Sequence, residues 1–328
     1  MEIRELCPGC GQGGVIREYN VRNWEFDRME RIYEYAICEG CGSLYRRIKS
    51  LNNEELYDSK EYGSLNSEVN EEDKSLKRRL RDAAAYLRDE YVFMDKKNPI
   101  GIILNRLFPY TGYMHIYSKQ LKRGATILDV GCGVGELAHK LKSHGVNVSG
   151  LDPYLNHTIY YKNGLIVEKK STSEIDKQYD IVFLHSVFEH LEDPEQVLCE
   201  LKNAIAPAGC LGLVFPGYGK MTKIYKEHSY VIQAPQHVCL YTENAIKSLA
   251  ERTGYKIERI MRESVYEWYI KSHLLKCGID FTENMNKKTL LAKLDKLEIR
   301  RLRMIWNKER KNSGDLYHVI MRKHEGIL

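Results

Sequence analysis

The 328-residue sequence contains no long apolar run. Its first ten residues, MEIRELCPGC, lack the apolar stretch of a secretory signal peptide, and no later segment approaches the roughly 20 apolar residues that cross a membrane. We therefore expect a cytoplasmic protein without a membrane span. The length allows one large domain or two modest ones.

The sequence also has little net charge. The formal charge of +5 is a mild excess that argues neither for nor against a polyanionic partner. Residues 1–60 contain nine Lys and Arg against eleven Asp and Glu, which is a poor electrostatic footprint for binding phosphate backbones. Nucleic acid is therefore disfavoured as a partner.

Cysteine, by contrast, is plentiful, and its spacing is informative. Nine cysteines in a reducing compartment suggest metal binding or isolated buried thiols rather than disulfides. Two Cys-x-x-Cys pairs, each followed by Gly, flank 27 residues that include the strand-like RIYEYAI. Four such thiolates can surround zinc as a tetrahedron, which leaves no open position for catalysis. We predict a zinc ribbon over residues 1–60 with a structural Zn²⁺ bound by Cys7, Cys10, Cys38 and Cys41.

A glycine-rich turn between a predicted strand and a predicted helix indicates a cofactor site. In the segment ILDVGCGVGELAHKL, residues 127–141, the glycines let a ligand approach the backbone and the first helical amides lack partners. A dinucleotide fingerprint would require a third glycine at position 136, which is Glu136. A carboxylate there would repel a pyrophosphate but is compatible with a cationic ligand such as S-adenosylmethionine. The predicted turn residues are Asp129, Gly131, Cys132, Gly133 and Gly135.

Acidic residues follow two predicted strands near this turn. Asp129, at the end of the first strand, is placed to set the turn and to attract the ammonium group of the cofactor. The segment GVNVSGLDP gives a second strand that ends at Asp152 and Pro153, where an open α/β fold places an acid for the ribose hydroxyls. The turn and this acid together are much stronger evidence than the turn alone.

Residues 179–216 complete the pattern. They predict a buried strand at 181–184, a helix at about 194–205, a Pro-Ala-Gly turn and a strand at 211–215. With DVGCGVG, LDP, EHLEDP and the later HVCLYT in order, residues 124–260 or so resemble class I S-adenosylmethionine-dependent methyltransferases of the type 11 and type 23 groups. The resemblance implies methyl transfer and an α/β, Rossmann-like seven-stranded sheet with helices on both faces.

The four-cysteine module extends this resemblance toward one group of acceptors. It is similar to the N-terminal module of sugar C-methyltransferases and of related enzymes in polysaccharide and natural-product pathways. This implies a small-molecule acceptor, such as a nucleotide-linked sugar or a pathway intermediate. Two alternatives stay open: a zinc-ribbon RNA methyltransferase and a non-catalytic cofactor-binding scaffold. The RNA alternative is weakened because LHSVFEH lacks the Asn-Pro-Pro-aromatic element of amino-directed base methyltransferases.

Three histidines are candidate catalytic residues. His237 matches a histidine that lies at the acceptor in the resembling family, and it could take a proton near neutral pH or only anchor its loop. His185 ends the predicted fourth strand and should face the cofactor, so it is also a candidate cofactor-binding residue. For His190, in the EHL element, we favour structural orientation over proton transfer. Methyl transfer does not require a base, because alignment supplies much of the acceleration.

The rest of the chain is assigned by pattern. Residues 61–123 are predicted as a linker and helical cap, in which Tyr110, Tyr113 and Tyr117 could line a pocket or pack on a helix face. Residues 124–328 are predicted as the methyltransferase domain, with a helical insertion at about 264–312 between its last two strands. The insertion contains one long amphipathic helix pattern. Its apolar half is expected to pack on the core, on a lid or on a second copy of the chain, which would make a homodimer.

Overall fold

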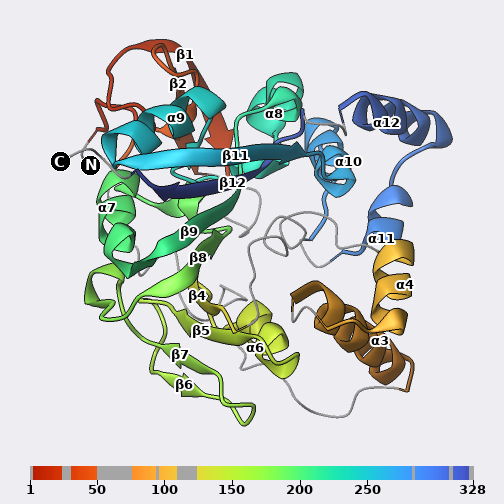
Figure 1. The fold of residues 1–328 in the computed structure, drawn as a ribbon. Coiled ribbons are helices and arrows are strands. Elements are labelled where there is room, and N and C mark those ends of the chain that lie inside the picture. Colours follow the sequence, from red (N-terminus) through yellow and green to blue (C-terminus); the bar gives the residue numbers. More distant parts are fainter. Residues whose placement is uncertain are drawn as a thin grey trace.

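A central mixed sheet organises the computed structural model, in which residues 3–23, 31–49, 76–93, 96–108, 124–282, 285–309 and 313–324 are described (Figure 1). Its strand order is β11-β12-β9-β8-β4-β5-β7-β6. The five strands from β9 to β7 are parallel, and β12, β11 and the short β6 pair antiparallel at the two edges. The strands are β4 (Thr126–Val130), β5 (Asn147–Leu151), β6 (Ile159–Tyr160), β7 (Ile166–Glu168), β8 (Tyr179–His185), β9 (Ile205–Pro216), β11 (Tyr255–Glu263) and β12 (Leu316–Lys323).

The sheet is the Rossmann-like α/β sheet that the sequence predicts, with one small addition and one shift. The predicted seven strands are joined by β6, a two-residue edge strand. The predicted Pro-Ala-Gly turn at 207–209 is wrong, because these residues belong to β9, which begins at Ile205. The pairing of β8 with β9 shifts between Tyr179 and Ile181, and this irregularity accommodates the extra residues.

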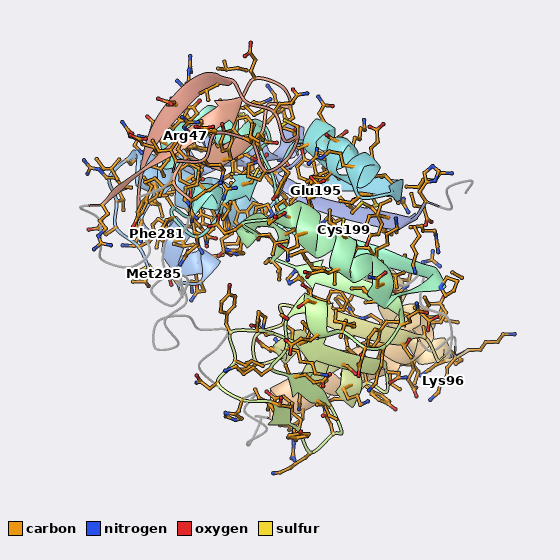
Figure 2. All side chains as sticks on the ribbon, turned by 90° about the vertical axis from the view of Figure 1, so that its left-hand side faces the viewer. Arg47, Lys96, Glu195, Cys199, Phe281 and Met285 are labelled. Carbon is orange, nitrogen blue, oxygen red and sulfur yellow. The ribbon has the colours of Figure 1, made fainter. Side chains whose placement is uncertain are left out.

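Helices cover both faces of the sheet. Alternate strand residues point to opposite sides, and both sides carry apolar residues that need covering. Leu128 on β4 belongs to a core cluster with α7 (Pro194–Ala204) and α9 (Glu243–Arg252). Its neighbour Ile127 belongs to a second cluster with α6 (Glu136–Ser143). Figure 2 shows the outer side of α7, which carries Glu195 and Cys199. The α9 helix starts as predicted, with the Thr242 hydroxyl accepting from the Ala245 amide at 3.3 Å.

The N-terminal strands form a smaller sheet that is completed by the rest of the chain. Its order is β1 (Val15–Arg22), β2 (Ile32–Cys38), β3 (Leu44–Arg46) and β10 (Cys239–Leu240). Strand β10, which lies between β9 and α9 in the sequence, pairs antiparallel with β3. The N-terminal module is therefore fastened directly to the segment that contains His237.

The segment between β11 and β12 is helical, but its predicted single long helix is wrong. It consists of α10 (Tyr266–Lys276), α11 (Lys287–Leu291) and α12 (Lys296–Glu309). Between the last two, an Asp295 carboxylate oxygen accepts from the amides of Leu297 at 2.7 Å and Glu298 at 2.8 Å and so begins a new helix. The apolar half packs inward at Leu290, Leu294 and Leu302, whereas Leu297 is 54% exposed. The homodimer through this segment stays a prediction.

Three further helices are described. The helix α3 (Leu76–Phe93) packs against α4 (Pro99–Leu107), and α8 (Lys220–Tyr225) follows β9. Tyr110, Tyr113 and Tyr117 lie outside the described residues. None of the helices in the described ranges combines the length and the apolar character needed to cross a membrane.

Candidate cofactor pocket and four-cysteine cluster

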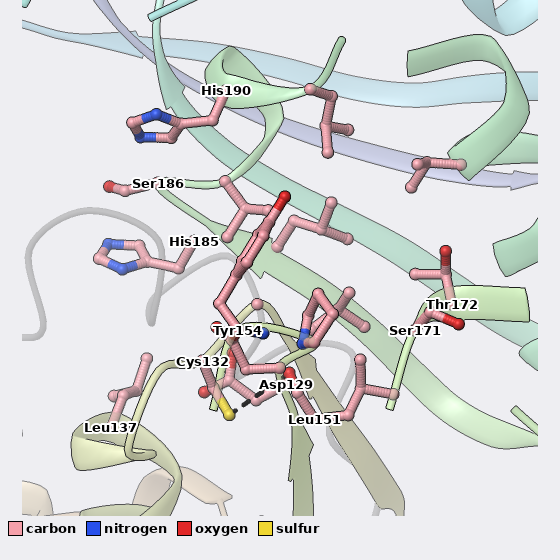
Figure 3. Close-up of a pocket in the computed structure, with 18 of the residues that line it drawn as sticks. Asp129, Cys132, Leu137, Leu151, Tyr154, Ser171, Thr172, His185, Ser186 and His190 are labelled. Carbon is pink, nitrogen blue, oxygen red and sulfur yellow. Dashed lines mark hydrogen bonds between the residues drawn. The ribbon is translucent and has the colours of Figure 1, made fainter. Parts of the chain in front are cut away.

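A cavity of about 720 Å³ opens at the carboxyl ends of β4, β5 and β8 (Figure 3). This is the edge at which open α/β sheets bind ligands, and the volume falls within the usual range for small-molecule sites. The sequence-predicted residues Asp129, Gly131, Cys132, Asp152, Pro153, His185 and His190 line it. Gly133 and Gly135 belong to the same turn, and His237 lies behind His190.

The turn after β4 depends on glycine at two crowded positions. Gly131 and Gly135 have φ angles of 70° and 82°, which side chains rarely adopt. A Cβ atom on Gly131 would lie 2.7 Å from a methyl carbon of Val187, and one on Gly135 would lie 2.7 Å from a methyl carbon of Val167. Side chains at these two positions would therefore force the turn or its neighbours to move.

Asp152 joins the turn to the end of β5. Its two carboxylate oxygens accept from the amides of Gly133 at 2.8 Å and Tyr154 at 2.9 Å. The Leu151 carbonyl accepts from the Gly131 amide at 2.8 Å. Burial raises the pKa of Asp152 above its ordinary value, while these amides oppose the shift. Asp152 is thus held in place at the cavity wall, where a ribose hydroxyl could donate to it.

Carboxylates outnumber cations in the described lining of the cavity. Burial, followed by the repulsion of Asp152, raises the pKa of Asp129 well above its ordinary value. A cationic ligand would reverse this effect by stabilising the ionised form. The acidic lining residues are Asp129, Glu136, Asp152 and Glu192, and the one described lysine or arginine in the lining is Lys140. This charge pattern favours a ligand with positive groups over a pyrophosphate.

Two of the three candidate histidines face the cavity. In Figure 3 the side chains of His185, Ser186 and His190 extend to the same side. Burial lowers the pKa of His185 to about 4 and that of His190 to about 4. Near pH 7 both rings are neutral, so they can accept hydrogen bonds but are weak bases.

His237 occupies a different position from the one expected for a residue that touches the acceptor. It is 3% exposed, and its Nδ1 lies 2.7 Å from the Val231 carbonyl oxygen. Its ring packs edge-on against His190, with the ring centroids 4.7 Å apart. Burial, with the neighbouring His190, lowers the pKa of His237 well below its ordinary value. The geometry favours the loop-anchoring alternative.

Several lining residues were missed from the sequence. Tyr154 follows the Asp152-Pro153 pair directly, and Ser171 and Thr172 follow β7, whose carboxyl end meets the same edge of the sheet. A signal existed for the latter two, because Ser171 and Glu174 form a capping box, S-x-x-E, after the apolar LIV segment. Glu192, in the EHLEDP segment, carried no comparable signal.

The four N-terminal cysteines come together at the edge of the small sheet. The sulfur atoms of Cys7 and Cys41 are 3.6 Å apart, and those of Cys10 and Cys38 are 3.4 Å apart. All four lie within 4.8 Å of one another. Sulfurs bound to a tetrahedral zinc at 2.3 Å would be about 3.8 Å apart, so the cluster matches a zinc site in ligand type and spacing. Burial raises the pKa of the Cys10 thiol to about 11, which a bound cation would reverse.

A buried arginine connects this module to the cavity. Arg46 on β3 is fully buried and pairs with Glu192, which lines the cavity, and it also donates to the Pro235 carbonyl. Arg4 pairs with the other carboxylate oxygen of Glu192. The Tyr35 hydroxyl donates to the His237 carbonyl at 2.7 Å. The N-terminal module therefore supports the cavity wall from behind.

Comparisons with known proteins agree with this geometry. Residues 103–260 match a family model described as a methyltransferase domain. The ubiquinone biosynthesis O-methyltransferase of Rickettsia typhi is 40% identical over 92 residues, which cover 25% of this chain and 37% of the relative. The same enzyme of Hydrogenovibrio crunogenus is 32% identical over 45% of this chain and 60% of its own. Phosphoethanolamine N-methyltransferase 2 of Caenorhabditis elegans is 28% identical over 41% of this chain and 33% of its own.

Solved structures of methyltransferases are similar only at a coarse level. A methyltransferase from Archaeoglobus fulgidus has a TM-score of 0.38 and 18% identity, and the match covers 73% of this chain and 99% of that one. The chain thus spans less than two thirds of the length of the curated relatives named above. The family match and the sheet with its glycine turn agree. Residues 103–260 contain a methyltransferase domain of the S-adenosylmethionine-dependent kind.

Proposed function

We propose that the chain transfers the methyl group of S-adenosylmethionine to a small-molecule acceptor beside His185 and His190. One observation carries the proposal: in a cavity with a glycine turn at one end and neutral imidazoles at the other, the charged lining residues are mainly carboxylates. Such a lining favours the sulfonium and ammonium groups of the cofactor. In this proposal, Asp152 binds the ribose and Asp129 faces the ammonium group.

The chemistry asks little of the protein beyond alignment. The acceptor atom attacks the methyl carbon, the bond between that carbon and sulfur breaks with its electron pair left on sulfur, and the acceptor releases its proton to water. In this proposal His185 and Ser186, which line the cavity, orient the acceptor by hydrogen bonds. Holding the acceptor, methyl and sulfur in line supplies the main part of the acceleration.

The acceptor class is a finer part of the proposal. A nucleotide-linked sugar is the first class to test, because the four-cysteine module resembles that of sugar methyltransferases. The names of the relatives bring an oxygen acceptor and an amine acceptor into the same screen. A nucleotide-linked sugar, a phenol and phosphoethanolamine make a panel that separates these classes.

We also propose that the four cysteines bind a structural zinc ion. The proposal is supported by the four sulfurs within 4.8 Å of one another and by the burial of Cys7, Cys38 and Cys41. Four protein ligands leave the ion no position for substrate. Its role in this proposal is to hold the small sheet against the loop that carries Glu192.

The cofactor assignment is tested by calorimetric titration with S-adenosylhomocysteine, with NAD as the control ligand. We expect binding of S-adenosylhomocysteine alone and at least tenfold weaker binding by Asp152→Ala, because the ribose loses its acceptor. Asp176→Ala, at an exposed carboxylate outside the cavity lining, is the matched control and should bind as the wild type does. Unchanged affinity in a folded Asp152→Ala protein would contradict the assignment.

A further inference from the structure

Glu189 is a buried acid whose position the methyl-transfer proposal does not use. It lies in the short 3₁₀ helix Phe188–His190 that follows β8, and it is 1% exposed. Within the described part of the chain its Oε2 atom has no hydrogen-bond partner. A buried carboxylate oxygen without a partner is costly, and protonation, a ligand or another compensating group can relieve that cost.

Two histidines direct their other ring nitrogen toward this acid. The Nδ1 atoms of His190 and His237 lie 3.1 Å from the Gln236 carbonyl oxygen and 2.7 Å from the Val231 carbonyl oxygen. A carbonyl only accepts, so in both rings Nδ1 carries the proton and the neutral ring has its lone pair on Nε2. Backbone carbonyls fix metal-binding histidines in this way.

The distances between these groups suit a shared ion better than hydrogen bonds. The Glu189 Oε1 atom lies 3.9 Å from the His190 Nε2 and 4.0 Å from the His237 Nε2, beyond hydrogen-bond range. The three ligand atoms lie within 4.8 Å of one another. Two imidazoles and one carboxylate with room between them are the donors that divalent first-row transition metals prefer.

We propose that Glu189, His190 and His237 form a second metal site, which binds one divalent first-row transition metal ion. The site differs from the cysteine cluster in its donors, since it offers two nitrogens and one oxygen in place of four sulfurs. Three protein ligands leave coordination positions open. His190 lines the cavity, so an ion bound there lies at the end of the cavity where the acceptor is proposed to bind.

The site also narrows the class of acceptor, a step that rests on the proposed methyl transfer. An ion with open positions beside the methyl donor would hold an acceptor through oxygen, as an enol, a phenol or a vicinal diol provides. Metal binding would also explain why a histidine occupies position 237. This residue is buried behind His190, so contact with the acceptor does not explain it. Metal binding itself can be measured without any acceptor.

The test is titration of the full-length, zinc-loaded protein with CoCl₂ and with MnCl₂. Cobalt binding is followed by visible absorption, manganese binding by the electron paramagnetic resonance of the free ion, and zinc retention by elemental analysis. We expect one Co²⁺ or Mn²⁺ per chain in addition to the zinc. Glu189→Gln, which keeps the shape of the side chain, should weaken binding at least tenfold. The matched control is Glu227→Gln, at an exposed Glu-His pair with 3.8 Å between Glu227 Oε1 and His228 Nε2, and it should bind as the wild type does.

The outcomes separate the metal site from the proposed function. If neither ion binds the wild type, or if a folded Glu189→Gln protein binds them equally well, the metal site is wrong even where S-adenosylhomocysteine binds. If the ions bind and S-adenosylhomocysteine does not, the metal site stands and the proposed function fails. Should Glu189→Gln not fold, His190→Asn replaces it, because its amide can still donate to the Gln236 carbonyl while the Nε2 ligand is lost.

Discussion

The four-cysteine cluster and the glycine turn are built to hold their groups in opposite ways. In the cluster, four side chains converge, and the backbone only positions them. In the turn, side chains are excluded at Gly131 and Gly135, and the backbone at Gly131 lines the cavity. The cysteine cluster is therefore defined by its side chains, and the glycine turn by the absence of side chains.

This difference decides how each region should respond to substitution. A side-chain cluster fails when one ligand is lost, because the remaining three thiolates repel one another without a full shell around the cation. A backbone site keeps its hydrogen bonds when a side chain is added, so it fails by crowding. The cluster should therefore respond mainly in stability, and the turn mainly in ligand affinity.

The largest expected effect is in the cluster. Cys38→Ser should lose the zinc and lower the free energy of unfolding by at least about 3 kcal/mol, because metal binding in such sites contributes directly to folding. Elemental analysis gives the zinc content and urea unfolding gives the stability. Cys199→Ser, which removes an exposed thiol from α7, is the matched control and should change neither (Figure 2). Full zinc content in Cys38→Ser would refute the four-cysteine site.

An intermediate loss of stability is expected at Glu192, where the N-terminal module contacts the cavity wall. Glu192→Gln leaves the fully buried guanidinium of Arg46 without its anionic partner, and we expect a loss of about 2 kcal/mol in stability. Because Glu192 also lines the cavity, the affinity for S-adenosylhomocysteine should fall a few-fold. Unfolding and calorimetric titration measure the two effects.

The control for Glu192→Gln is a substitution three residues further along the chain. Glu195→Gln breaks an ion pair with Arg252 in which the Glu195 side chain is 45% exposed, so it should cost less than about 1 kcal/mol and leave cofactor affinity unchanged. Equal stability losses in Glu192→Gln and Glu195→Gln would show that the N-terminal module does not support the cavity wall.

Most of the sheet could be predicted from the sequence because its signals are local. The strand at 181–184 was recognised from its apolar run, and the helix at Thr242 from its cap. The single long helix predicted within residues 264–312 is wrong, because the signal that divides it is not visible in the apolar pattern. Its apolar spacing continues through residues 292–295, and only the bonds from Asp295 to the following amides show that a new helix starts there.

The site residues likewise fall into those that local motifs predict and those that only tertiary contacts position. Gly131 and Asp152 belong to spaced motifs and were found, whereas Glu192 reaches the cavity through tertiary pairing with Arg4 and Arg46, about 150 residues or more distant in the sequence. His237 was identified as a candidate, but its position behind His190 follows from the strand β10 that joins the small sheet. No local pattern encodes that pairing.

The sharpest test of the comparison is expected at the turn. Gly131→Ala and Gly164→Ala both place a side chain at a positive φ, 70° and 80°, and this backbone strain should cost each about 1 kcal/mol in stability, to which crowding adds at Gly131. Only at Gly131 does the new Cβ meet a close neighbour, 2.7 Å away on Val187 in the cavity wall, because at Gly164 the nearest atom is 3.9 Å away on Lys142. Calorimetric titration should therefore show at least tenfold weaker binding of S-adenosylhomocysteine to Gly131→Ala and unchanged binding to Gly164→Ala. Equal affinities would mean that the ligand does not depend on close approach to this backbone, and the contrast between a side-chain site and a backbone site would fail.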